Sequence, residues 1–492
     1  MKHSLWALLA ALVVGSCAST PPDRQVVLDA AEALGGRQKI LGIKTLTVEG
    51  EGASPNVGQN TMPDSELPVW KVTEFKRTID PANGRMRTRQ LRTAQFMFAN
   101  SNTQRQDQGL DGAVAYNVGM DGMATRASAN AAQDRRIEML HHPLTIVRAA
   151  LDEPNATISN LRTAGNQQIV EIKTAKGEML TLAIDAGTKL PTRVTSMSDN
   201  ANLGDVAIDT AFLDYEDVGG VKLPKHLITK IDKYLQFDLQ VAKNTIDDGA
   251  AEADLAAPEA VKAAEAPPAF PPVVVTVEPV AKGIWWLAGS GNHRSVVFEF
   301  DNHLTLFETP VNEARSKAVI DKARTLSSKP LTQAVVSHHH FDHSGGLRVA
   351  VAEGLTIITY KDNEEFFKDL VARRHSLVED ALARNPKPLK LVTVDDTMTM
   401  KDNSMEVQLF HLRDNPREGT NLFAYVPRDR ILVQADLYDS TWMYHYWGEN
   451  VITNIEKIRK LRVDKQVPIH GAIQSYREMV KTIRAKPGPP KD

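Results

Sequence analysis

The chain has 492 residues but only one cysteine, Cys17. A single cysteine excludes intramolecular disulfides and cysteine ligands, so a metal site would have to use histidine and carboxylate side chains. Neither sign of charge is in excess, because 58 Lys and Arg residues stand against 61 Asp and Glu residues. This balance argues against a nucleic-acid partner, which would require a basic domain or stripe. After the N-terminal segment, no stretch reaches the roughly 18 uninterrupted apolar residues of a membrane span.

The first 17 residues have the pattern of a secretory signal peptide, with a charged start, an apolar stretch and small residues before Cys17. The sequence Val-Gly-Ser-Cys that ends at Cys17 resembles a bacterial lipobox, which implies that this cysteine is acylated and anchors the protein to a membrane. Ala18 and Ser19 favour, by the same resemblance, an outer-membrane lipoprotein of the cell envelope that faces the periplasm. The alternative is plain secretion, with cleavage after Ala18 or Ser19.

The length predicts two domains. Residues 25–246 alternate apolar and polar side chains between turn signals, which predicts a mainly antiparallel β domain with some helices. Residues 247–272 are rich in alanine and proline and predict a linker that contains a helical turn or two. Residues 273–492 form the second domain. The strands expected in the first domain are 46–51, 70–79, 86–93, 168–174, 179–184, 206–215 and 235–241.

The most informative segment is 337–346, SHHHFDHSGG. His338, His340, Asp342 and His343 have H-x-H-x-D-H spacing, directly after a predicted buried strand and before a glycine pair that allows a sharp turn into a helix. Imidazole and carboxylate groups at a strand end can converge, and both suit zinc or a similar divalent ion. The spacing allows two adjacent ions. The alternative is a chance histidine cluster on a solvated loop.

This motif resembles the signature of the metallo-β-lactamase superfamily, and other segments match in the same order. Residues 284–287, 295–300 and 304–310 resemble the opening strands of that fold, and the last of these contains Glu308. Residues 431–438 resemble the strand that ends in a metal-bridging aspartate, here Asp436, and 467–471 resemble the strand end with the last ligand, His470. The resemblance covers about 273–478 and implies an αββα sandwich, so the whole chain is expected to be α+β. The metal ligands that it implies are His338, His340, Asp342, His343, Asp436 and His470.

One position departs from the family pattern. The third histidine of the first metal site is replaced by Arg417, whose guanidinium has no lone pair to offer a metal. We therefore expect one zinc ion in the second site, although two ions remain an alternative if His411 or His445 replaces the missing ligand. Arg417 could instead hold an anionic group of the substrate. The alternative is a surface arginine paired with Asp414 or Glu418.

The resemblance implies hydrolysis by a metal-bound hydroxide, with Asp342, Asp436 and Arg417 as catalytic residues. The bond cleaved could be an ester, amide, thioester, phosphoryl or sulfate bond of a small-molecule substrate, which Arg417 suggests is anionic.

One alternative function is a degenerate metal site used only for binding. Another is a lipid or lipoprotein carrier, because 30–52 and 214–232 resemble segments of the periplasmic lipoprotein carriers, whose curved sheets hold acyl chains. A sheet covered by its own helix, which only spaces or docks the catalytic domain, is the simpler alternative for that domain.

Overall fold

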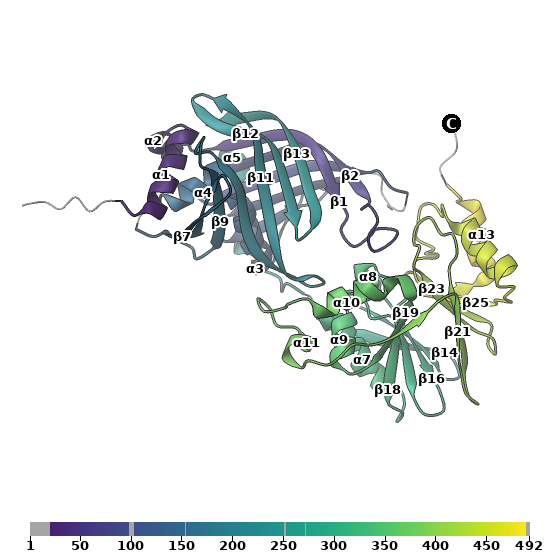
Figure 1. Cartoon of the computed structure of the whole chain (residues 1–492). Coiled ribbons are helices and arrows are strands. Elements are labelled where there is room, and N and C mark those ends of the chain that lie inside the picture. The colour runs from purple at the N-terminus through teal and green to yellow at the C-terminus, as the bar shows by residue number, and fades with distance from the viewer. Residues whose placement is uncertain (1–19, 98–102, 153, 250–251, 271, 489–492) are drawn as a thin grey trace, which may run out of the picture.

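The computed structural model describes residues 20–97, 103–152, 154–249, 252–270 and 272–488. The predicted signal peptide and Cys17 therefore lie outside the described residues. Within the described part, a large curved sheet precedes a smaller layered domain (Figure 1). No helix among the described residues is both long enough and apolar enough to cross a membrane.

The N-terminal domain is built on a 13-stranded sheet in which every neighbouring pair is antiparallel, with the order β6-β5-β4-β3-β2-β1-β13-β12-β11-β10-β9-β8-β7. In chain order the strands are β1 (Leu46–Pro55), β2 (Val69–Asp80), β3 (Arg85–Ala94), β4 (Thr103–Asp111), β5 (Val114–Val118), β6 (Ala124–Arg126), β7 (Thr157–Ala164), β8 (Gln167–Lys173), β9 (Met179–Asp185), β10 (Pro191–Asn200), β11 (Gly204–Val218), β12 (Val221–Ile231) and β13 (Tyr234–Ile246). All seven expected strands are present. Strands such as β4 and β10 were not expected, because their sequences are mostly polar and carry little apolar alternation.

Helices pack against this sheet. They are α1 (Pro22–Leu34), α2 (Arg37–Gly42), α3 (Ala129–Leu140) and α4 (Pro143–Ala150). Apolar residues of α1, α2 and α4, such as Val27, Ile40 and Ile146, share one core with the strands. The break between α1 and α2 requires glycine, because Gly35 has a φ of 133° and a Cβ there would lie 2.3 Å from the Gly220 carbonyl oxygen.

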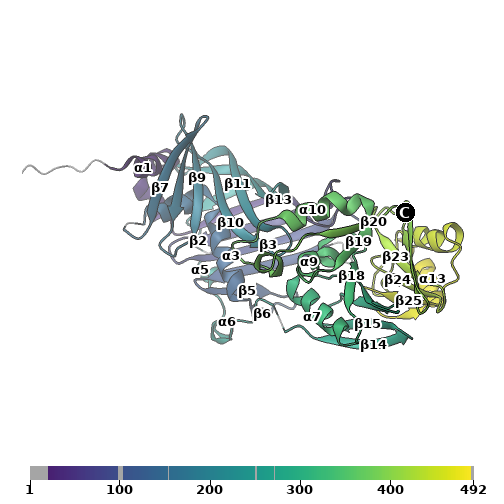
Figure 2. The ribbon, with the colours of Figure 1, turned by 60° about the horizontal axis from the view of Figure 1, so that its bottom comes forward.

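The linker segment packs against the sheet. It contains the expected helical turns, α5 (Glu252–Leu255) and α6 (Glu259–Ala263), and Figure 2 shows α6 beside β6. Leu255 and Val261 are buried, and the Asp254 carboxylate pairs with Arg87 at 2.9 Å. The linker is therefore anchored to the N-terminal domain rather than extended through solvent.

The C-terminal domain is an αββα sandwich, as predicted. One sheet has the order β14-β15-β16-β17-β18-β19-β20 and the other β21-β22-β23-β24-β25-β26. In β16, Val296 and Phe298 face the core between the sheets while Val297 faces the outer helices, which is the period of two of a strand with both faces buried. The strands are β14 (Val275–Ala281), β15 (Ile284–Gly289), β16 (Ser295–Glu299), β17 (Leu304–Phe307), β18 (Leu331–Val335), β19 (Thr356–Tyr360), β20 (Lys390–Val394), β21 (Thr397–Lys401), β22 (Glu406–His411), β23 (Leu422–Val426), β24 (Ile431–Gln434), β25 (Lys465–Pro468) and β26 (Gln474–Ser475).

Helices form the outer layers of the sandwich. The first sheet is covered by α7 (Glu313–Arg324), α9 (Leu347–Ala352), α10 (Glu364–Ala372) and α11 (Ala381–Arg384), and the second by α12 (Gly448–Ile452) and α13 (Tyr476–Ala485). The short helix α8 (Phe341–Ser344) lies within the histidine motif. Two further helical turns, Lys361–Asn363 and Thr453–Ile458, precede α10 and follow α12.

The two domains are docked through the hairpin between β10 and β11. Leu203 and Val206 from this hairpin belong to the apolar core of the C-terminal domain. The Asp205 carboxylate accepts hydrogen bonds from the backbone N–H groups of Ser376 and Leu377, both at 2.9 Å. Buried apolar contact and satisfied polar groups together hold the domains in one arrangement.

Candidate metal centre

The predicted ligands meet at one edge of the sandwich. The motif follows the end of β18 and includes α8, while Asp436 and His470 follow β24 and β25. Because β24 and β25 are adjacent and parallel, their ends lie at the same edge. Asp436 has a φ of 59°, a conformation that non-glycine residues adopt mainly at turns and functional sites.

Four ligand atoms converge on one point, which we call the second site. Oδ1 of Asp436 lies 3.1 Å from Nε2 of His470 and 3.3 Å from Nε2 of His343. Oδ2 of Asp342 lies 3.4 Å from the same His343 atom and 3.7 Å from the same His470 atom. Two imidazoles and two carboxylates make a ligand set suited to zinc and similar divalent ions.

Outer contacts orient both imidazoles of the second site. Nδ1–H of His343 donates to the Glu308 carboxylate at 2.9 Å, and Nδ1–H of His470 donates to the Asn292 carbonyl oxygen at 2.7 Å. Each ring therefore turns an Nε2 lone pair inward, and these two Nε2 atoms lie only 3.1 Å apart. Two facing lone pairs repel unless a positive charge lies between them, so the residues fit a bound cation.

The charged groups of the second site also favour a bound cation. Burial alone would lower the pKa of His343, but the carboxylates of Asp342, Asp436 and Glu308 hold it well above its ordinary value. Burial alone would raise the pKa of Asp342 and of Asp436, but the charge on His343 holds both well below their usual range. The three carboxylates thus favour a positive charge at this point, and protons compete with a metal for it.

Two histidines and one carboxylate face one another at the first position of the centre. Nε2 of His338 lies 3.1 Å from Nδ1 of His340, and both rings are fully buried. Oδ2 of Asp436 faces them at 3.8 and 3.9 Å. Asp436 therefore extends one carboxylate oxygen toward each position, as the resemblance implied for a bridging ligand.

Arg417 lies beside this first position. Its side chain is only 6% exposed, and Nη2 donates to Oδ2 of Asp436 at 3.1 Å. The same nitrogen donates to Oε1 of Gln59 at 2.8 Å. The arginine is therefore part of the buried site and is not the surface residue of the alternative interpretation. A fixed guanidinium next to Asp436 therefore supplies positive charge beside this first position.

The other histidines considered from the sequence lie elsewhere. Nε2 of His411 lies 2.9 Å from the Gly419 carbonyl oxygen, and its ring stacks on Tyr360 with the centroids 3.8 Å apart. His445 is buried against Tyr438. Neither belongs to the groups of His, Asp and Glu atoms that could hold a metal in the described part of the chain.

The structure adds two residues that the sequence did not single out as ligands. His293, on the loop between β15 and β16, places Nε2 3.3 Å from Oδ2 of Asp342 and joins it and His470 in a candidate group. Glu418 is buried, and its Oε2 lies 2.8 Å from Nε2 of His340. The sequence could have suggested His293 as a ligand, because it follows a predicted strand (284–287) of the sheet that also contains β18.

We expect Glu308→Gln to weaken metal binding. Glu308 accepts hydrogen bonds from His343 Nδ1–H and from the Ser337 backbone N–H at 2.8 Å, whereas a glutamine has one acceptor oxygen and would turn its NH₂ group toward one of these donors. Loss of such an orienting partner lowers metal affinity about 10–100-fold. Competition titration against a chelating dye measures it, with the partly exposed Glu299→Gln as control. Wild-type affinity in Glu308→Gln would contradict the orienting role.

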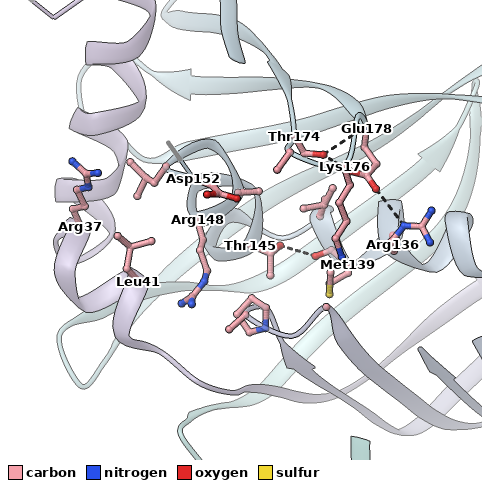
Figure 3. A pocket seen from close by; sticks show the side chains of 17 residues that line it. Arg37, Leu41, Arg136, Met139, Thr145, Arg148, Asp152, Thr174, Lys176 and Glu178 are labelled. Carbon is pink, nitrogen blue, oxygen red and sulfur yellow. Dashed lines mark hydrogen bonds and ion pairs between the residues drawn. The ribbon is translucent and has the colours of Figure 1, made fainter. Parts of the chain in front are cut away.

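Two pockets of the N-terminal domain bear on the lipid-carrier alternative. One has a volume of about 500 Å³, and Figure 3 shows Arg37, Arg136, Arg148 and Lys176 around it. The other, of about 460 Å³, mixes apolar side chains such as Phe237 with charged and amide groups. Neither pocket has the uniformly apolar lining that an acyl chain would favour.

Comparisons with known proteins give distant similarities. No protein-family model matches the chain. The linear primary-alkylsulfatase of Pseudomonas sp. (strain ATCC 19151) is 22% identical over an alignment of 231 residues, and the match covers 38% of this chain and 43% of that protein. The match thus spans less than half of the length of this curated relative. The metallo-β-lactamase from Pontibacter korlensis is 15% identical with a TM-score of 0.34, over 43% of this chain and 98% of its own. The metallo-β-lactamase from Hirschia baltica is 16% identical with a TM-score of 0.33, over 43% of this chain and 96% of its own.

The assignment of the C-terminal domain to the metallo-β-lactamase fold rests on the αββα layers together with the His-x-His-x-Asp-His motif at the sheet edge. The N-terminal domain has no comparable assignment, and its resemblance to the lipoprotein carriers stays a prediction.

Proposed function

We propose that this protein is a metal-dependent hydrolase that binds one divalent ion, zinc, through Asp342, His343, Asp436 and His470. The observation that carries the proposal is the convergence of their four ligand atoms, with both imidazoles oriented by outer hydrogen bonds. A divalent ion bound there supplies Lewis acidity, which polarises the bond to be cleaved and lowers the pKa of nearby water.

The two aspartates of the site have different surroundings. Asp436 is enclosed by His343, His470 and Arg417 and only 5% of its side chain is exposed, which suits it to neutralise positive charge. Asp342 has 30% of its side chain exposed and can be reached by water and substrate. Because its pKa lies well below the usual range, Asp342 is ionised at neutral pH, and its carboxylate can accept a hydrogen bond that orients the attacking water.

Arg417 supports an anionic substrate. A buried guanidinium beside the metal site binds sulfate, phosphate or carboxylate oxygens in a paired geometry. The alkylsulfatase relative, although distant, acts by its name on a sulfate ester of an alkyl chain. We therefore propose a small-molecule sulfate ester as the first substrate class to test.

We also propose that the protein works at the cell envelope, facing the periplasm and attached to the outer membrane through acylated Cys17. The support is the lipobox-like sequence that ends at this single cysteine.

The test uses the full chain, treated with a chelator and then reloaded with zinc. We expect hydrolysis of a linear alkyl sulfate that disappears with the chelator and returns with the metal. An uncharged carboxylic ester of the same chain length serves as the comparison and should react more slowly, because Arg417 has no anion to bind. Metal binding without cleavage of any ester would instead support the degenerate binding-protein alternative.

A further inference from the structure

We propose that the N-terminal domain completes the metal centre. The loop between β1 and β2, residues 56–68, is a fixed part of the site, and Gln59 in this loop is a positioning residue for Asp342 and Arg417. The catalytic consequence rests on the proposed hydrolase function, whereas the effect on the metal site does not.

Gln59 bridges the two charged groups that flank the site. Its Nε2 donates to Oδ1 of Asp342 at 2.8 Å, and its Oε1 accepts from Nη2 of Arg417 at 2.8 Å. A neutral side-chain amide can donate to a carboxylate and accept from a guanidinium at once, as Gln59 does here. The bridge leaves Oδ2 of Asp342 directed toward His343 and His470.

The backbone of the same loop contacts the metal motif. Nε2–H of His340 donates to the Asn60 carbonyl oxygen at 2.8 Å, which turns the Nδ1 lone pair of that ring toward His338. The Gly419 backbone N–H donates to the Thr61 carbonyl oxygen at 2.9 Å. These bonds tie the loop to both the motif and the segment that carries Arg417. In Figure 1 this loop lies next to α8.

The backbone of the loop approaches the Phe341 ring so closely at Gly58 that this position requires glycine. Gly58 has a φ of 77°, and a Cβ there would lie 2.2 Å from the Phe341 ring. A larger residue would therefore push the loop away from α8. The chain thus has a residue at this position that permits tight docking over the motif.

The loop is ordered by its own contacts. The Asn60 side chain donates to the Pro63 carbonyl oxygen at 2.8 Å, and Ser65 Oγ donates to the Met62 carbonyl oxygen at 3.0 Å. Moving the loop with its domain would also expose Leu203, which is buried in the core of the C-terminal domain. Both features favour a permanent part of the site over a lid that opens in each turnover.

This arrangement also defines the side from which substrate enters. His338 and His340 are fully buried beneath the loop, whereas the side chains of Asp342 and His293 are 30% and 25% exposed. Substrate therefore reaches the second site from the side of Asp342 and His293, and the loop closes the side of the first position.

The test compares Gln59→Ala and Gln59→Glu with the control Gln95→Ala, an exposed glutamine of the same domain outside the site, all in the full chain. The first readout is the visible absorption spectrum with Co²⁺ alone, which reports the ligand arrangement without any substrate. We expect unchanged cobalt stoichiometry but a shifted spectrum in both Gln59 variants, because Asp342 loses its orienting hydrogen bond, and a wild-type spectrum in the control.

The second readout is the separation of kcat from KM on a substrate of the zinc-loaded enzyme. We expect Gln59→Ala to lower kcat about tenfold, the effect of one hydrogen bond to a charged group, with a smaller change in KM. Gln59→Glu should lower it further, because its carboxylate repels Asp342. A wild-type spectrum and wild-type kcat in Gln59→Ala, or a faster turnover, would overturn the proposal. A shifted cobalt spectrum in a protein that cleaves no ester would support it while refuting the hydrolase function.

Discussion

Replacing His343 or His470 with alanine is expected to abolish metal retention and hydrolysis together. Each substitution removes one of the four ligands. It also leaves the carboxylates of Asp342 and Asp436 with one fewer imidazole beside them. Because loss of an outer partner already lowers metal affinity about 10–100-fold, loss of a ligand should exceed that range. His338→Ala is the matched control from the same motif and should cost much less, since the first position has Arg417 beside it.

Metal analysis after gel filtration and an activity assay measure both effects on the same samples. We expect one ion per wild-type chain and less than one in His343→Ala and His470→Ala. Equal losses from all three histidine variants, together with two ions per wild-type chain, would show that the first position binds a metal despite Arg417. The one-ion interpretation would then be wrong.

Arg417→Ala is expected to lower kcat/KM for an anionic ester by about a hundredfold, the usual cost of removing one fixed donor from a developing negative charge. Bound metal should stay unchanged, because the four ligands of the second site remain. Turnover of an uncharged ester should change much less. Removal of Arg417 leaves the buried Asp436 without its 3.1 Å partner, so thermal unfolding is measured in parallel. Arg417→Lys keeps the charge without the planar fork and should recover part of the loss.

Arg417→His provides the complementary result. A histidine there would join His338 and His340 as a third imidazole, and we expect the metal capacity to rise from one ion to two at saturating zinc. The guanidinium already lies beside Asp436, whose Oδ2 is 3.8 Å from Nε2 of His338. An unchanged capacity would mean that the backbone at position 417 cannot present a ligand, and the relation between the arginine and the first metal would be wrong.

Local pattern predicted much of the fold. The αββα domain was predicted from the resemblance of the histidine motif, and of segments such as 295–300 and 431–438, to the metallo-β-lactamase superfamily. In the N-terminal domain, strands with clear alternation were predicted, but β4 and β10 were not. Their polar sequences are held in the sheet by neighbouring strands on both sides, so tertiary pairing outweighs their weak local pattern.

The residues of the metal centre were also predicted only in part. The ligands could be proposed from the sequence, because they lie within one motif or at the ends of recognisable strands, and strand ends meet at one edge. The groups that orient these ligands could not be proposed from the sequence. Asn292 acts through a backbone carbonyl, which every residue has, and Gln59 lies 283 positions before the Asp342 that it contacts.

By itself, the sequence determined the ligand types, their spacing and the absence of thiolate ligands, because these depend on residue identity alone. That Arg417 stands where a histidine is expected came from the resemblance to the superfamily. Only the tertiary structure decided that Arg417 turns into the site toward Asp436, and that a loop of the other domain lies over His340. The position of that loop depends on the docking of Leu203 and its hairpin against the C-terminal core. Contacts between distant segments arise from the packing of whole domains, and no local pattern encodes which polar side chain that packing brings to a metal site.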